Sequence, residues 1–402
     1  MDDPNAAENG LAIYKKIDLL ATIEQEESNV RNSVTNLQVF SLYSLYIFTT
    51  IIAFLLGLLI EGSKFSTPVA TIAGGFLGFL LTYPAYKVGV TRPTEFLGDY
   101  GCDLVGKLPH VCFMTYIFVT NLLLAVINLR ELSDFLLSEY LLGTPGWAIV
   151  IIFMVCVAYA IFCGIETIFE IAQGIFLVSA LAFLLIPILA YQELETDMFI
   201  ALFTHLKARE IGKGMIESTL MFGQMSFLFL MFPYLKTPKK TYRTFFFTTC
   251  SIILVVLAHV ISVLLTFGPE LGANLMYPDM DLVRFVRVGS FIESFDPILI
   301  VLFLTSVFVK ISFNVFICVL CLSHLTGIKN YRMYTLPIAA FVAVYSLVVI
   351  QSQPELFEFF EFEFAVILMI GEFLIPWIYW MMLLIRGGTK KGKPADKLPA
   401  GT

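Results

Sequence analysis

Residues 39–60 read VFSLYSLYIFTTIIAFLLGLLI, and none of these 22 residues carries a charge. An α-helix needs about 20 predominantly apolar residues to cross the hydrocarbon core of a bilayer. Unpaired backbone N–H and C=O groups are costly in that core, so a spanning segment is either a helix or part of a closed barrel. A run of this length indicates a helix, and the stretch therefore predicts a transmembrane span.

The composition of the whole chain agrees with this prediction. Of the 402 residues, 58% are hydrophobic and only 14% are charged, and the mean hydropathy is +0.85. A soluble protein carries about 25% charged residues. We therefore predict an all-α polytopic membrane protein that contacts membrane lipid and binds no nucleic acid.

Apolar windows predict ten transmembrane helices. They lie at 37–60, 67–88, 108–129, 147–163, 171–191, 215–235, 244–267, 297–325, 334–350 and 364–385. This pattern divides the chain into three parts. A polar tail with a short amphipathic helix occupies 1–36, the ten-span domain occupies 37–385, and a disordered basic tail occupies 386–402.

The basic residues predict the orientation of these spans. The two tails and alternate loops hold 17 of the 25 Lys and Arg residues, the opposite loops hold 7, and the remaining one is Lys310. Cytoplasmic loops are enriched in Lys and Arg, so we expect both termini to be cytoplasmic. In the outer loop at 268–296, a Gly-Pro turn followed by an amphipathic pattern predicts a short helix.

Lys310 lies near the middle of the eighth span, where a charge costs about 2.5–3.5 kcal/mol on translocon-based scales. Ser306 and Asn314 lie four residues away on either side, on the same helix face. We therefore expect this polar stripe to face the interior of the bundle. It is explained either by a structural pair between helices or by a functional site, and the functional interpretation is favoured because intramembrane charges commonly mark such sites.

The sixth span contains Phe222, Gly223 and Gln224, preceded by Gly214 and Ser218. Glycine costs about 1 kcal/mol relative to Ala in a helix interior, so these residues predict a break in the helix. Free backbone N–H and C=O groups at such a break can hold the carboxylate and ammonium of a small solute. Close helix packing through small residues is the alternative.

Polar residues in other spans complete the predicted ligand-binding set. Thr49 and Thr50 lie in the first span, and Asn121 lies in the third. Each of them alone is more often an interhelical hydrogen bond than a ligand contact. Glu372 of the tenth span is expected to be a counter-charge for Lys310 or for another buried donor.

The sequence carries no sign of catalytic chemistry. It contains no nucleophile with an adjacent base, no phosphate-binding loop and no His or Cys spacing typical of a metal site. We therefore predict no catalytic residues, cofactor or bound metal, and we do not expect the chain to be an enzyme.

Several stretches resemble one known family. They are NLREL (128–132), MFPYLKTPKK (231–240), FGPELGANLMYP (267–278), and SFIESFDPILIVLF (290–303) followed by VFVKISF (307–313). Together they resemble the endospore germination permease family. Its members are the B subunits of spore germinant receptors, within the amino acid–polyamine–organocation transporter superfamily.

The resemblance implies a five-plus-five inverted repeat, with helices one and six broken around a central site. It also implies a location in the spore inner membrane and a complex with a germinant receptor A subunit and a lipoprotein C subunit. The implied function is sensing of a small germinant, often an amino acid. Lys310 would be a fixed internal cation, where relatives of this fold hold a sodium ion between spans one and eight.

Two stretches depart from the family pattern. Members often show Gly-x-Gly in span one, where this chain reads TTIIAFLLG (49–57), and Phe-Gly-Glu in span six, where it reads Phe222-Gly223-Gln224. The missing carboxylate disfavours proton coupling and indicates a ligand held by hydrogen bonds rather than by a charged partner. A proton-coupled amino acid transporter, or a scaffold or ion-conduit subunit that binds no nutrient, stay as alternatives to a sensor.

Overall fold

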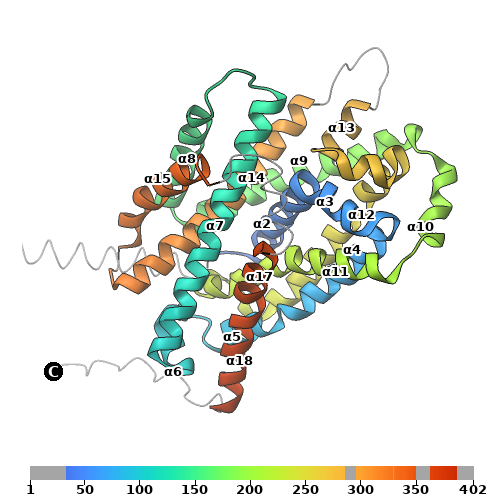
Figure 1. Cartoon of the computed structure of the whole chain (residues 1–402). Helices are drawn as coiled ribbons and strands as arrows, with labels where there is room; N and C mark the ends of the chain where they lie inside the picture. The colour runs from blue at the N-terminus through green and yellow to red at the C-terminus, as the bar shows by residue number, and fades with distance from the viewer. Residues whose placement is uncertain (1–32, 286–295, 329, 350–362, 387–402) are drawn as a thin grey trace, which may run out of the picture.

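The computed structural model describes residues 33–285, 296–328, 330–349 and 363–386. The predicted tails lie almost wholly outside these residues, including the amphipathic helix expected in the first tail. Within the described ranges the backbone is nearly all helical, and the β-type pairing is a single isolated bridge between Val34 and Leu235. This architecture confirms the predicted all-α fold class (Figure 1).

Described helices cover all ten predicted spans. Span one comprises α2 (Asn36–Phe48), η1 (Thr49–Leu55) and α3 (Leu56–Ser63), and span two comprises α4 (Thr67–Leu81) and α5 (Tyr83–Thr91). Spans three to five are α7 (Lys107–Glu139), α8 (Gly146–Cys163) and α9 (Ile165–Ala190), and span six comprises α11 (Ala208–Gly223) and η5 (Gln224–Tyr234). Spans seven to nine are α12 (Thr241–Asn274), α14 (Asp296–Thr326) and α15 (Thr335–Ser346), and span ten comprises α17 (Glu363–Leu368), η8 (Met369–Leu374) and α18 (Ile375–Ile385). Eight segments of the described chain are long and apolar enough to cross a membrane. The first of them, Leu56–Thr91, joins the end of span one to span two. In span nine, α15 has 12 residues.

The helices are arranged around span one (Figure 1). On one side α7 packs along α14, and α8 packs along α15. On the other side α4 packs along α11. Helix α2 contacts α9, α12 and α14, and its residues from Ser41 to Phe48 are all buried. Polar groups on span one therefore face other helices rather than lipid.

The start of span one is joined to the end of span six. Thr35 caps α2 through a reciprocal pair of hydrogen bonds with Gln38, which satisfies backbone donors that the first helical turn leaves free. Just before it, the Val34 N–H donates to the Tyr234 carbonyl at 2.9 Å, and the Lys236 N–H donates to the Val34 carbonyl at 2.8 Å. These bonds hold the ends of the two spans side by side.

Three spans change helix type in the middle of the bundle. Span one becomes a π-helix at Thr49–Leu55, span six becomes a 3₁₀-helix at Gln224–Tyr234, and span ten becomes a π-helix at Met369–Leu374. The predicted irregularities in spans one and six therefore occur as changes of hydrogen-bond pattern, without an extended loop in the described backbone. Such segments are frequent at functional sites and hinges.

Small residues in the first half of span six serve helix packing. A Cβ added at Gly74 of α4 would lie 2.5 Å from the Met215 carbonyl oxygen and 2.5 Å from the Ser218 Cβ. A Cβ added at Gly214 of α11 would lie 2.7 Å from the Ser63 Cβ. The packing interpretation therefore holds for Gly214 and Ser218, while Gly223 and Gln224 mark the change of helix type.

Gly74→Ala is expected to lower the stability of the protein by about 1–3 kcal/mol, because the new methyl group meets backbone that cannot move aside. Gly174→Ala in α9 is the matched control, since a Cβ there meets nothing within 4 Å. Ala is the better helix former, so the control should be as stable as the wild type or slightly more stable. Thermal unfolding of both purified variants in detergent measures this, and equal midpoints would contradict it.

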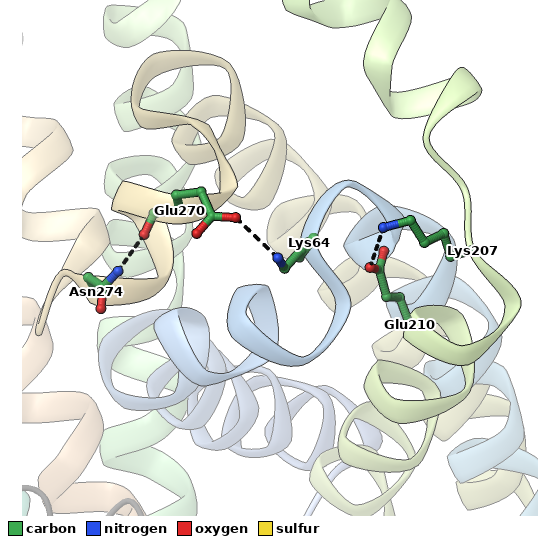
Figure 2. A network of polar contacts seen from close by, with 5 residues as sticks. All are labelled: Lys64, Lys207, Glu210, Glu270 and Asn274. Atoms are coloured by element: carbon green, nitrogen blue, oxygen red, sulfur yellow. Dashed lines mark hydrogen bonds and ion pairs between the residues drawn. The ribbon is translucent and has the colours of Figure 1, made fainter.

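Ion pairs and a short helix cover one end of the bundle. Lys64 Nζ lies 3.1 Å from Glu270 Oε1, and Lys207 Nζ lies 3.0 Å from Glu210 Oε1 (Figure 2). Pairs as exposed as these contribute about 0–1 kcal/mol. The first part of the predicted short helix in this loop is present as α13 (Pro278–Phe285), and the part of the pattern from 286 onward lies outside the described residues. Asp279 of α13 bonds buried His259 of α12 at 2.5 Å.

Candidate solute site at the centre of the bundle

Lys310 of α14 is buried, with 2% of its surface exposed. Its ammonium donates a hydrogen bond to Thr50 Oγ1 in η1 at 2.7 Å and lies 5.2 Å from the centroid of the Tyr46 ring. The Tyr46 hydroxyl in turn donates to Asn314 Oδ1 at 2.8 Å. These contacts join span one to span eight, and we call Tyr46, Thr50, Glu131, Lys310 and Asn314 the lysine cluster.

Glu131 of α7 supplies the charge opposite Lys310. Its side chain is buried at 7% exposure, and its carboxylate and the Lys310 ammonium attract each other. Buried charged groups need hydrogen-bond partners, and the Thr50 hydroxyl provides one for Lys310. Among the described residues, Glu131 is the acidic group whose charge acts on Lys310.

Glu372 of η8 lies beside span six instead. A Cβ added at Gly223 would come closer than 3.0 Å to Glu372 Oε2 and to the Phe373 ring. The carboxylate therefore rests against the backbone at the point where α11 becomes η5. The side chain is fully buried, and in the described part of the chain neither carboxylate oxygen has a hydrogen-bond partner.

Other buried acceptors lie at residues that adjoin Gly223 and Glu372 in the chain or face them across the bundle. Gln224 is 2% exposed, and among described residues nothing donates to its Oε1. Thr120 of α7 faces Gly371, where an added Cβ would lie 3.4 Å from the Thr120 Oγ1. We call Thr120, Gly223, Gln224, Gly371 and Glu372 the glutamate cluster. Tyr46 lies within electrostatic reach of Glu372, so the two clusters are neighbours.

The two clusters differ in what they can do chemically. In the lysine cluster, the hydrogen bonds from Lys310 to Thr50 and from Tyr46 to Asn314 join spans one and eight. The glutamate cluster contains a charge and several acceptors that no described residue pairs. Within the described residues, no group of three or more His, Cys, Asp or Glu could hold a metal ion. The arrangement is suited to binding a small polar solute.

The sequence of this chain matches one known protein family over most of its length. The family described as "Spore germination protein" matches residues 33–379 of this chain. The chain belongs to the spore germination protein family. A curated member, the spore germination protein YndE of Bacillus subtilis (strain 168), is 24% identical over 245 residues. That match covers 60% of this chain and 66% of YndE, which is just under two thirds of its length.

Solved structures show which fold this chain has. A crystal structure of MhsT in complex with L-phenylalanine matches with a TM-score of 0.63, and the match covers 90% of each chain. A substrate-bound, outward-open Na⁺-coupled sialic acid symporter matches with a TM-score of 0.58, over 87% of this chain and 89% of the symporter. Both are 11% identical, so the likeness shows the fold alone. It confirms a polytopic, inverted-repeat transporter fold.

The other predicted site residues of this germination protein lie near the clusters. Ser306 is fully buried, as is expected from its place on the Lys310 face. Thr49 bonds the Leu45 carbonyl at 2.8 Å, and Asn121 bonds the Ile117 carbonyl at 2.9 Å through its Nδ2. Phe222 instead packs on Gly75 and Gly78 of α4, so it fills the contact between spans two and six.

Sequence reasoning missed Tyr46 and Glu131, and its expectation that Glu372 is a counter-charge for Lys310 or for another buried donor stays a prediction. A signal for Glu131 does exist, because Asn121, Asn128 and Glu131 are spaced by seven and three residues and share one face of α7. Tyr46 carries no such signal. Tyr46 lies four residues before Thr50, on the same helix face, but many apolar residues of span one share that face. Spacing therefore does not distinguish Tyr46 from them.

Proposed function

We propose that this chain is the membrane subunit of a nutrient germinant receptor. A small solute binds at the two central clusters, and binding favours one arrangement of the bundle. This change acts on partner subunits, a receptor A subunit and a lipoprotein C subunit, and triggers germination. The chain resides in the spore inner membrane with both termini in the cytoplasm.

One observation carries the proposal. Buried polar groups of spans one, three, six, eight and ten meet where three of these spans change helix type, inside a transporter fold of a germination family. Buried polar groups are costly when unpaired, so they mark function rather than packing. A ligand shifts a two-state equilibrium only through its differential affinity for the two states, and clusters that span several helices supply such a difference.

Binding of a solute to the purified full-length chain tests the proposal. A panel of amino acids, sugars and nucleosides is screened by thermal unfolding in detergent. A ligand at 100 times its Kd stabilises the folded state by about 2.7 kcal/mol, which raises the unfolding midpoint by several degrees. If no solute shifts the midpoint while the chain still assembles with its partners, the chain is a scaffold or ion conduit and not a sensor.

One observation favours a second candidate function, that of a proton-coupled transporter, and it concerns Glu372. A buried carboxylate without a partner among the described residues is a group that can take up a proton. Proteoliposomes separate the two functions, because a transporter accumulates solute and loses this ability when the pH gradient is removed. A sensor binds the solute with no accumulation.

A further inference from the structure

The glutamate cluster contains buried acceptors that no described residue pairs. Both carboxylate oxygens of Glu372 and the amide oxygen of Gln224 are buried, and no described residue donates a hydrogen bond to them. Buried polar atoms in folded proteins are nearly always paired. The cluster is therefore suited to a ligand that brings hydrogen-bond donors.

The charge of Glu372 also lacks compensation among the described residues. Lys310 is engaged by Glu131 and by the Thr50 hydroxyl. The neighbouring Tyr46 donates its hydroxyl to Asn314. A carboxylate removed from water is stable only when it is paired or neutralised. The ligand that completes the cluster is therefore expected to carry a positive charge.

A proton and an ammonium group could each neutralise Glu372, and they differ in the number of hydrogen-bond donors that they bring. A single proton converts Glu372 to a carboxyl with one O–H donor, which leaves the remaining acceptors unpaired. An ammonium group brings three N–H donors and no acceptor. Two of these donors match the two unpaired oxygens of Glu372.

We propose that Glu372 holds the protonated amine of the solute. Gly223 makes this subsite, because it lets the carboxylate approach the backbone of span six. The inference rests on the proposed function and narrows it to one ligand class, small solutes that carry a primary ammonium group. Family members often have a glutamate in span six at the position of Gln224. In this chain Glu372 of span ten supplies that carboxylate instead.

Isothermal titration of the purified full-length chain tests the subsite. The probes are L-amino acids and ethanolamine, each amino acid paired with its hydroxy acid, such as L-alanine with L-lactate. The wild type is expected to bind at least one amine about 10-fold or more tightly than the matched hydroxy acid, since charge-assisted hydrogen bonds are the strong ones.

Glu372→Gln keeps the shape of the side chain and removes its charge. It is expected to weaken binding of the amine about 10-fold or more and to leave binding of the hydroxy acid unchanged. Glu363→Gln in α17 is the matched control, because Glu363 lies in the same span and is exposed. Gln224→Leu is a second variant that should also weaken binding of the amine. The unfolding midpoint of each variant without solute shows that it is folded.

Each outcome bears on the inference. Equal amine affinity of Glu372→Gln and wild type would overturn it and leave the proposed function standing, as would binding of sugars, nucleosides or hydroxy acids alone. A Glu372-dependent stabilisation by NaCl or KCl in the absence of amines would assign the cluster to an inorganic cation and also overturn it. If the wild type binds no solute of any class, the proposed function itself fails, and the subsite with it.

Discussion

Lys310→Met is expected to abolish the response to solute and to lower the stability of the folded protein by about 3–5 kcal/mol. The substitution removes the bond to Thr50 and the positive charge that acts on buried Glu131. Met is chosen because its unbranched side chain adapts to the space that the lysine leaves. Germination of spores that carry the variant and thermal unfolding of the purified chain measure the two effects.

A double variant separates these two effects. Lys310→Met combined with Glu131→Gln removes both charges, and loss of both partners of a buried pair is often nearly neutral for stability. Stability is therefore expected to return to within about 1–2 kcal/mol of the wild type, while the response stays absent because the internal cation is gone. A Lys310→Met spore that germinates normally at normal receptor levels would show that this cation has no role.

Gly223→Ala is expected to eliminate solute binding while the protein still folds. The added methyl group would come closer than 3.0 Å to Glu372 Oε2 and to the Phe373 ring. Both are ends of side chains, so they move aside rather than unfold the helix, and the Glu372 carboxylate leaves its place at the backbone. Titration with the solute that the wild type binds, together with the unfolding midpoint, measures the result.

Gly212→Ala is the matched control for this variant. Gly212 lies in the same helix, α11, and a Cβ there meets nothing within 4 Å. Because Ala is the better helix former, the control should fold and bind solute at least as well as the wild type. If both variants bind solute alike, the contact between Gly223 and Glu372 does not shape the site.

The clusters also bear on one expectation about the ligand. The sequence has Gln224 where family members often keep a glutamate, which indicates a site without a carboxylate. The folded chain nevertheless has a carboxylate beside Gly223, because span ten contributes Glu372. A single position in a motif therefore does not establish the charge of a site that several helices build.

Much of the fold could be predicted because membrane insertion depends on local properties. Length and hydrophobicity place the spans, as the agreement of 147–163 with α8 (Gly146–Cys163) illustrates. The stripe of Ser306, Lys310 and Asn314 could be placed facing inward for the same reason, since lipid excludes such groups. All three residues are buried in the folded chain.

The sequence by itself determined that this protein crosses the membrane, which faces of its helices turn inward, and to which family it belongs. Only the tertiary structure decided which polar residues meet. Thr50 and Lys310 are 260 residues apart in the chain, and Tyr46 and Asn314 are 268 apart. Contacts at such separations depend on how whole helices pack, and helical periodicity specifies a face of a helix but not the partner opposite it.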